Sequence, residues 1–231
     1  MRLILRNLGV LDYASCFDAM QRATAQRQVD TADEIWTVQH PSVFTLGRAG
    51  KREHILAAGN IPVIESDRGG QVTYHGLGQL VVYTLLDVRR MGIGPRELVC
   101  RLEQGIIDYL ATLAINAERR QGAPGVYVSG DKVAALGLRI KNRYSYHGIA
   151  LNVAMDLEPY QRINPCGYAG LGVTDLYALC GLNNVEVVRE ALMAHLLASL
   201  YERQSLDVEL HPQLDESLNT VESVSKTEAT L

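Results

Sequence analysis

A cysteine in an irregular, glycine-rich loop is a candidate nucleophile in this sequence. Cys166 lies in INPCGYAGLGVTDL (residues 163–176), in a composition that excludes a helix interior or a regular strand. A thiol in such a loop is more accessible than one on a buried helical face, and accessible thiols near cations are the reactive ones. Most loop cysteines are inert, so both a nucleophilic and a structural role stay open.

A lysine at the start of an apolar strand is a candidate proton carrier. Lys132 opens GDKVAALGLRI (residues 130–140), where alternation puts it on the same face as Ala134 and Leu136. Partial burial would lower the pKa of its ammonium group and make it a usable base. Without further information the pattern favours the alternative, in which Lys132 belongs to the turn and reaches water.

A third segment, RGGQVTYHGLGQL (residues 68–80), places polar side chains between pairs of glycines. On a strand, Gln71, Thr73 and His75 share one face, and Val72 and Tyr74 lie on the other. Glycines allow the backbone to approach a ligand closely or to turn sharply. An exposed polar face on a hairpin explains the pattern equally well.

Several catalytic and cofactor motifs are absent from the sequence. GRAGKR (residues 47–52) lacks the spacing of a phosphate-binding loop, and no dinucleotide fingerprint, H-E-x-x-H or G-x-S-x-G occurs. The six histidines show no metal-ligand spacing. We therefore expect neither a bound metal nor a cofactor.

The elements that must position these residues alternate between strands and helices. Strands are predicted over 2–6, 34–39, 43–46, 61–66, 71–76, 79–88, 125–128, 132–140 and 144–153, and helices over 12–27, 95–115, 174–179 and 184–203. Asn183 with Glu186 resembles a capping box for the last helix. The pattern predicts an α/β protein, an α+β sandwich whose sheet is mixed or largely antiparallel.

Composition fits one soluble domain. The 231 residues are 47% hydrophobic and 21% charged with a net charge of −4, which excludes bulk attraction to nucleic acid. The longest uncharged stretch, residues 69–86, is interrupted by polar residues, so no membrane span is expected. The start resembles no secretory signal, and four cysteines without a framework indicate a reduced, cytoplasmic protein.

The C-terminal segment differs from the rest of the chain. Residues 207–231 carry six acidic residues against Lys226 alone, a net charge of −5, and have no aromatic residue. Such a composition buries little apolar surface, so a flexible tail is expected there, after a single domain over residues 1–206.

Five segments in order resemble the lipoyl(octanoyl) transferase family. They are HPSVFTLGR (40–48), RGGQVTYHG (68–76), GDKVAALGLR (130–139), HGIALNV (147–153) and INPCGY (163–168). The likeness spans about residues 34–180. Leu77 replaces the usual proline and Ile149 a common aromatic residue, differences that bear on pocket shape rather than on chemistry.

This resemblance implies the α/β fold of the biotin and lipoate protein ligase catalytic domains, with Cys166 and Lys132 as the catalytic pair. A thiol of pKa about 8.5 is only ~3% ionised at pH 7, and a nearby ammonium group would stabilise the thiolate. The family's substrate-binding segments fall on Arg68, Gly69, Gly70, Gln71, Val72, Thr73, Tyr74 and His75, on Ala135, Leu136 and Gly137, and on Gly148, Ile149 and Ala150.

The resemblance also implies the reaction. Cys166 would take an octanoyl group from octanoyl-acyl carrier protein and pass it to a lysine of apo lipoyl domains, those of 2-oxoacid dehydrogenases and of the glycine cleavage H protein. This is the first step of endogenous protein lipoylation and needs no ATP. The acidic substrates would dock on Arg48, Lys51 and Arg52, or on the strand face of Arg139, Lys141 and Arg143, unless these residues form only a solvated face.

Three alternatives remain at this point. An ATP-dependent lipoate or biotin protein ligase would share the fold but would form an adenylate and no cysteine adduct. A transferase that moves octanoyl between lipoyl-bearing proteins would not use the carrier protein. A non-catalytic binding module, in which Cys166 is structural, would form no acyl adduct.

Overall fold

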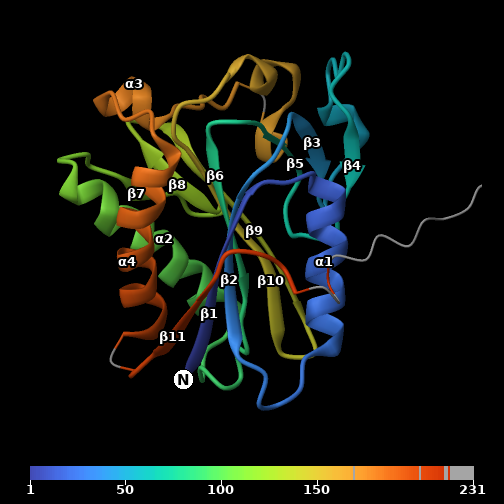
Figure 1. The fold of residues 1–231 in the computed structure, drawn as a ribbon. Helices are drawn as coiled ribbons and strands as arrows, with labels where there is room; N and C mark the ends of the chain where they lie inside the picture. The colour runs from blue at the N-terminus through green and yellow to red at the C-terminus, as the bar shows by residue number, and fades with distance from the viewer. Residues whose placement is uncertain (169, 203, 216–217, 219–231) are drawn as a thin grey trace, which may run out of the picture.

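A mixed sheet of eight strands, counted over the part of the chain that is described, forms the centre of the computed structural model (Figure 1). The description covers residues 1–168, 170–202, 204–215 and 218, and it omits the side chain of Cys166. The strand order is β11 (Asp207–His211), β1 (Arg2–Val10), β2 (Asp33–Gln39), β6 (Gln79–Leu85), β10 (Tyr144–Asn152), β9 (Asp131–Lys141), β8 (Gly125–Val128) and β7 (Glu118–Arg119). Strand β1 runs parallel to β2 and β11, and the other neighbours are antiparallel, which confirms the predicted mixed sheet.

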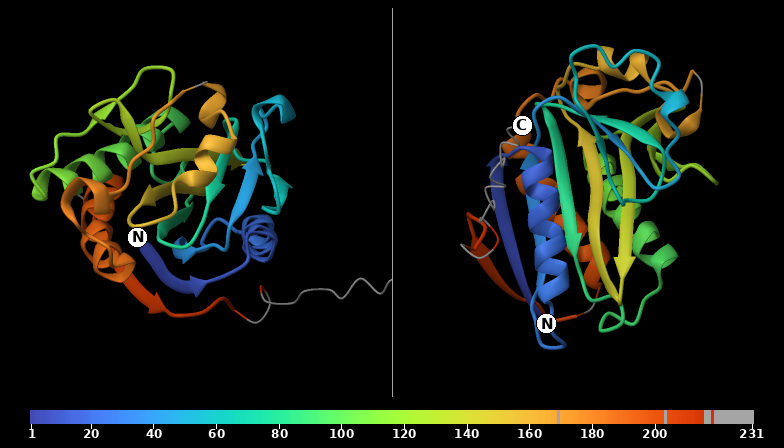
Figure 2. Two further views of the ribbon diagram at one scale, coloured as in Figure 1. Left: turned by 90° about the horizontal axis from the view of Figure 1, so that it is seen from above. Right: turned by 90° about the vertical axis from the view of Figure 1, so that its right-hand side faces the viewer.

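Helices cover both faces of the large sheet (Figure 2). Helix α1 (Tyr13–Gln26) packs on one face, where Cys16 and Met20 contact Trp36 and Tyr83 in an apolar cluster. Helices α2 (Pro95–Thr112) and α4 (Val185–Tyr201) pack together on the other face, over the larger cluster. The apolar stripe that predicted α1 is thus explained by core packing, and Cys16 is fully buried as expected.

A small three-stranded sheet lies on the same side of the large sheet as α1 (Figure 1). Its order is β4 (Val63–Glu65), β3 (Val43–Leu46) and β5 (Val72–His75). The short helices η1 (Arg52–His54), η2 (Glu158–Arg162), η3 (Pro165–Gly167) and α3 (Leu176–Cys180) complete the described elements. Strand β5 carries the predicted polar face above the large sheet, and η3 carries Cys166.

The ends of the helices agree with the sequence signals, with one difference. Pro95 begins α2 directly after Gly94, as predicted. The N-cap of α4 is Asn184 and not Asn183, because the Asn184 side chain accepts hydrogen bonds from the backbone N–H groups of Glu186 and Val187. The three long helices and the hairpins otherwise begin and end within a few residues of their predicted bounds. None of the helices in the described ranges has the length and apolar character that a bilayer crossing requires.

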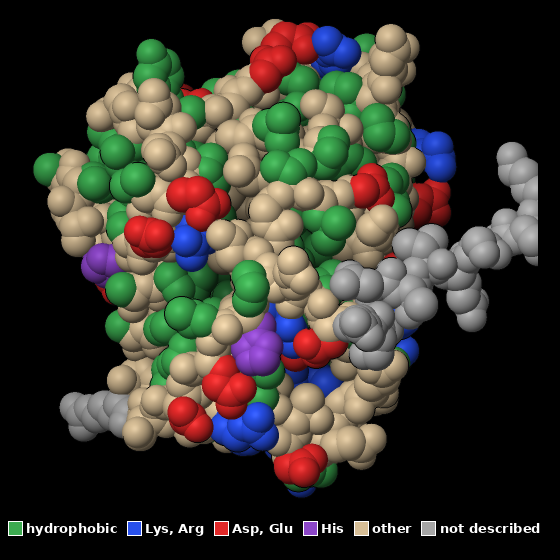
Figure 3. All heavy atoms as spheres, viewed as in Figure 1, with side chains coloured by type: hydrophobic (Ala, Val, Ile, Leu, Met, Phe, Trp, Pro, Cys, Tyr) green, Lys and Arg blue, Asp and Glu red, His purple; other side chains and the backbone are tan. Residues whose placement is uncertain are grey.

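The expectation of a flexible tail from residue 207 is wrong for the residues described there. Residues 207–211 form β11, a parallel edge strand on β1, and Arg6 binds the carboxylate of Asp215. Leu218 is buried against the α1 cluster. Charged side chains do not prevent edge pairing, because every residue of β11 is exposed or half-buried, and acidic and basic groups are mixed on this face (Figure 3). Residues 219–231 lie outside the described part.

Candidate active site

The loop with Cys166 is tied to η1 by a backbone hydrogen bond and lies beside the small sheet. Helix η3 follows Asn164, whose N–H donates to the carbonyl of His54 at 2.8 Å. At Gly167, with φ of +79°, an added Cβ would lie 3.4 Å from Cγ of Gln71 and 3.5 Å from Nε2 of His54. The backbone of η3 therefore lies beside the predicted polar face of β5. The Cys166 side chain itself is outside the described residues.

Lys132 is buried rather than turned to solvent. Lys132 is only 3% exposed, and its Nζ donates to the carbonyl of Pro124 at 3.2 Å. The same ammonium lies 5.1 Å from the centre of the Tyr127 ring, within the range of a cation–π contact. The interpretation of Lys132 as a turn residue that reaches water is wrong, because β8 and the residues before it close over the start of β9.

The chain that follows Cys166 is paired directly with Lys132. The N–H of Lys132 donates to the carbonyl of Gly172 at 2.9 Å, and the N–H of Thr174 donates to the carbonyl of Lys132 at 3.1 Å. A side chain at position 172 would collide with the carboxylate of Asp131, so glycine permits this approach. The two candidate catalytic residues, remote in sequence, thereby belong to one locally tied structure.

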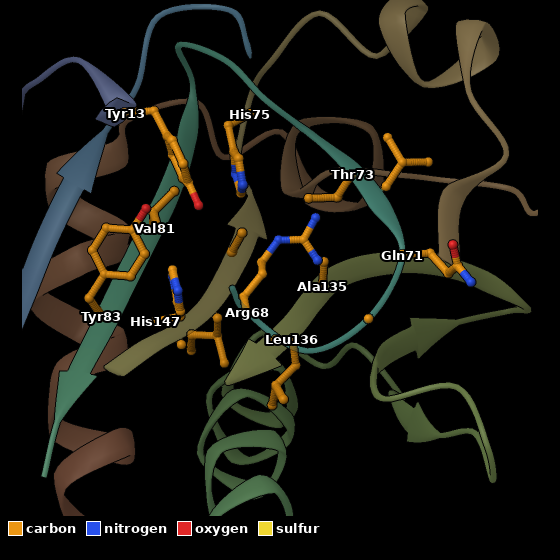
Figure 4. Close-up of a pocket in the computed structure, with 16 residues that line it drawn as sticks. Tyr13, Arg68, Gln71, Thr73, His75, Val81, Tyr83, Ala135, Leu136 and His147 are labelled. Atoms are coloured by element: carbon orange, nitrogen blue, oxygen red, sulfur yellow. The ribbon is translucent and has the colours of Figure 1, made fainter. Parts of the chain in front are cut away.

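A narrow cavity of about 50 Å³ lies between the small sheet and the large one (Figure 4). We call it the slot; its lining is Tyr13, Arg68, Gly70, Gln71, Val72, Thr73, His75, Val81, Tyr83, Ala135, Leu136, Gly137, His147, Gly148, Ile149 and Ala150. All predicted substrate-binding residues except Gly69 and Tyr74 line it. That they bind substrate stays a prediction.

Gly69 and Tyr74 lie elsewhere for identifiable reasons. The N–H of Gly69 donates to the carbonyl of Leu138 at 2.9 Å, which ties the loop to β9 outside the slot. Tyr74 points away from the polar face of β5, as alternation requires, and packs against Phe44 and Tyr160. Tyr74 thus supports the small sheet.

Small residues form the floor of the slot. Ala135 lies opposite Ala150, and Gly137 opposite Gly148, on the paired strands β9 and β10. A Cβ at Gly148 would collide with the carbonyl of Val82, so no larger residue fits there. Missing side chains on the floor leave room above the strands for a ligand.

Four lining residues were not predicted: Tyr13, Val81, Tyr83 and His147. Tyr13 reads as core from its helical phase, and Val81 and Tyr83 lie within a strand that is apolar throughout. His147 begins the family segment HGIALNV, which was the available signal. Their positions at the slot depend on how α1 packs on the face of the large sheet that includes β6 and β10.

His75 at the slot and His40 behind it are buried and neutral. Burial lowers the pKa of His75 to about 3, reinforced by the nearby His40, and burial lowers the pKa of His40 to about 4. His75 donates from Nδ1 to the Gln79 side chain at 2.7 Å, and His40 accepts the Tyr83 hydroxyl at Nε2 at 2.8 Å. At neutral pH these rings carry no charge, so this part of the slot suits an uncharged ligand.

Arg68 acts on the slot by holding its wall. Its guanidinium donates to the Thr45 hydroxyl at 3.1 Å from Nε, to the Thr45 carbonyl at 2.7 Å from Nη2, and to the Gly69 carbonyl at 2.9 Å from Nη1. These bonds tie the loop of residues 66–70 to β3. Arg68 therefore positions the predicted polar segment above the floor.

His147 combines burial, backbone strain and an unpartnered atom. It has φ of +60° within β10, a conformation that non-glycine residues adopt at a cost of about 1–3 kcal/mol. Its Nε2 lies 2.8 Å from Asp67 Oδ1, and its buried Nδ1 has no hydrogen-bond partner within the described ranges. Burial lowers the pKa of His147, opposed by Asp67. The ring thus presents a bare acceptor at the slot.

A wider groove of about 470 Å³ adjoins the slot and extends to neighbours of the two candidate catalytic residues. Gly70, Gln71, Leu136 and Gly137 line both cavities. The groove continues to Pro124, which accepts the hydrogen bond from Lys132, and to Tyr168, two residues after Cys166. A ligand in the slot can therefore extend through the groove toward Pro124 and Tyr168.

The chain has close relatives among known proteins. The lipoyl protein ligase A/B catalytic domain family matches residues 12–197. An octanoyltransferase of Pseudomonas putida is 57% identical over 195 residues, covering 84% of this chain and 91% of the relative. An octanoyltransferase of Xanthomonas axonopodis pv. citri is 58% identical over 192 residues, covering 83% of each.

Solved structures show the same fold at low identity. Lipoate-protein ligase A bound with ATP has a TM-score of 0.77 at 14% identity, with 95% of this chain and 93% of that chain covered. A biotin protein ligase of Aquifex aeolicus has a TM-score of 0.54 at 15% identity, with 88% and 73% covered. These matches confirm the predicted ligase-like fold. From the family match and the close relatives, the chain belongs to the lipoyl protein ligase A/B catalytic domain family, within its octanoyltransferases, which confirms the family and the acyl-transfer activity predicted from the motifs.

Proposed function

We propose that octanoyl transfer proceeds in two steps, with Cys166 as the acyl acceptor and Lys132 as the adjacent proton carrier. The observation that carries this proposal is the backbone pairing of Lys132 with Gly172 and Thr174, in the chain that follows Cys166. The groove beside them opens into the slot. An ammonium group near a thiol favours the thiolate, which is the nucleophilic form.

In the first step, the Cys166 thiolate attacks the carbonyl carbon of a carrier-bound octanoyl thioester. A new carbon–sulfur bond forms, the bond to the carrier sulfur breaks, and the leaving thiolate takes a proton from the Lys132 ammonium. In the second step, a lysine amine of the acceptor attacks the enzyme thioester and forms an amide. The Cys166 sulfur leaves, and Lys132 recovers the amine's proton. Because a thioester is converted to an amide, no nucleotide is required.

The slot suits a medium-length acyl chain. Its histidines are neutral, and its floor is made of alanine, glycine and β-branched residues. Burial of each methylene contributes about 0.8 kcal/mol, so an eight-carbon chain gains substantially from an apolar slot. We assign the substrate-binding role to the predicted residues that line it.

The two substrates proposed are octanoyl-acyl carrier protein and apo lipoyl domains of 2-oxoacid dehydrogenases and the glycine cleavage H protein. A neighbour of similar fold, a bipartite lipoate protein ligase of Thermoplasma acidophilum, was described together with its E2 lipoyl domain. Its TM-score is 0.72 at 15% identity, with 94% of this chain and 89% of that chain covered. This supports a lipoyl domain as the acceptor class. The free thiols of Cys16, Cys100 and Cys180 fit a reducing compartment, and we place the reaction in the cytoplasm.

The decisive experiment is an intact-mass measurement after incubation with octanoyl-acyl carrier protein and no ATP. One octanoyl adduct is expected on the protein, labile to hydroxylamine and absent in Cys166→Ala. The matched controls are Cys100→Ala and Cys180→Ala, because both residues are exposed and should not matter. An adduct that requires ATP, or one that persists in Cys166→Ala, would contradict the proposal and favour a ligase mechanism or another nucleophile.

A further inference from the structure

Another cavity, of about 380 Å³, lies between α1 and the C-terminal half of β9. It is separate from the slot and from the groove. We call it the basic cavity. The residues used in the argument are Arg22 and Thr24 on α1, Asp67 between β4 and β5, Arg139 and Lys141 on β9, and Tyr146 on β10.

Three polar atoms of this cavity are buried without a partner. Within the described ranges, Nε of Arg22, Nε of Arg139 and Oγ1 of Thr24 make no hydrogen bond. Thr24 is only 6% exposed. Buried donors without acceptors are costly, and three at one cavity indicate that an acceptor binds there.

The charge of the cavity favours an anion. Arg22, Arg139 and Lys141 supply three positive charges against the one carboxylate of Asp67, whose oxygens are held by His147 and Tyr146. This excess of positive charge attracts an anion, such as a carboxylate on an acidic protein surface. Three other basic residues considered for docking are already paired, Arg143 with Asp87, Arg52 with Glu65 and Lys51 with Glu53.

We propose that the basic cavity binds a carboxylate side chain of the acyl carrier protein and holds the carrier during the first step. This inference rests on the proposed function and adds a docking point to it. Arg139 is seven residues beyond Lys132 on one strand, a separation of about 23 Å at the usual rise of ~3.3 Å per residue. A carrier bound so far from Lys132 still delivers its thioester, because the thioester sits at the end of a long pantetheine arm. A lysine on a lipoyl domain is much shorter, so that domain must sit at the groove itself.

The test uses the double variant Arg139→Gln/Lys141→Gln and, independently, Arg22→Gln. Arg89→Gln is the matched control, since Arg89 is exposed on the loop after β6. With octanoyl-acyl carrier protein, KM should rise at least fivefold in both test variants, with kcat unchanged and Arg89→Gln like wild type. With octanoyl-pantetheine, which has no protein surface, kcat/KM should stay within twofold. Transfer from preformed acyl-enzyme to the lipoyl domain should also be unchanged.

Three results would overturn the docking proposal: an unchanged KM for the carrier protein, an equal loss with octanoyl-pantetheine, or a defect confined to the lipoyl-domain step. Competition by inorganic phosphate beyond the effect of chloride at equal ionic strength, with an unchanged carrier KM, would assign the cavity to a free anion instead. Failure of the proposed function is recognised separately, because wild-type protein would then form no Cys166 adduct with either donor.

Discussion

The imidazole of His147 donates from Nε2 to Oδ1 of Asp67 at 2.8 Å, and this pair forms the wall between the slot and the basic cavity. His147 lines only the slot and Asp67 only the basic cavity. The second oxygen of Asp67 accepts the hydroxyl of Tyr146. The strained backbone of His147 is therefore maintained by a charge-assisted hydrogen bond from its own ring.

Asp67→Asn should destabilise the protein at neutral pH by about 1–3 kcal/mol, because an amide replaces a carboxylate that accepts two hydrogen bonds. Despite partial burial, which raises it, the pKa of Asp67 is lowered below 3.8 by His147 and Tyr146. A lowered folded-state pKa gives a stabilisation that is present above the unfolded-state pKa and lost as the pH falls through the folded-state value. The difference between variant and wild type in urea unfolding should thus shrink only below about pH 4. Asp30→Asn, at an exposed site, serves as the control.

The buried histidines predict a loss of stability in mild acid. Burial lowers the pKa of His75 to about 3 and of His40 to about 4, from 6.5 in the unfolded chain. Between these limits the unfolded chain binds protons that the folded chain does not, so the free energy of unfolding falls as the pH falls, by up to ~1.4 kcal/mol per pH unit for each histidine.

Urea midpoints measured from pH 7 to pH 4.5 test this slope. His40→Asn should lower stability at pH 7, because the bond to Tyr83 is lost, and should flatten the slope by about 1.4 kcal/mol per pH unit. His195→Asn, on α4 and away from the slot, is the matched control variant. An unaltered slope in His40→Asn would show that His40 is not neutral in the folded protein.

The sequence was sufficient for most of the elements and for most of the slot lining. Strict alternation put Gln71, Thr73 and His75 on one face of a strand, and the structure keeps that face at the slot. Motifs of this kind are local, so a single segment carries the information. The polar face on β5 is read correctly without knowing what lies opposite it.

The parts that were missed depend on contacts between distant segments. Lys132 is buried because β8 and Pro124 cover it, and nothing in its own strand reveals that cover. Tyr13 has the phase of a core residue, yet it lies at the point where core and cavity meet. The edge strand β11 forms in an acidic segment because β1 offers a free edge and Arg6 offers a charge partner. Local composition does not encode such partners.

Replacement of Lys132 should separate its charge from its proton transfer. Lys132→Met keeps the chain length without the amine, and Lys132→Arg keeps the charge but does not release a proton. Both variants should slow single-turnover acylation of Cys166 by about 10²–10⁴-fold, since general acid–base catalysis contributes that much. Rapid-quench mass spectrometry measures the rate. If Lys132→Arg acylates nearly as fast as wild type, charge alone is sufficient and the proton-carrier role is wrong.

The floor of the slot should set the acyl chain length. Ala135 and Ala150 face each other across β9 and β10, so a larger residue at either position fills the space that a chain would occupy. Ala135→Leu should displace roughly three methylenes of the substrate, at about 0.8 kcal/mol each, and lower kcat/KM for octanoyl-pantetheine about 50-fold. Butyryl-pantetheine, too short to reach the filled space, should lose less than threefold. Ala111→Leu, on the exposed side of α2, should change neither value. Equal losses for the two donors would mean that position 135 affects catalysis or folding rather than chain length, and that the acyl chain lies elsewhere.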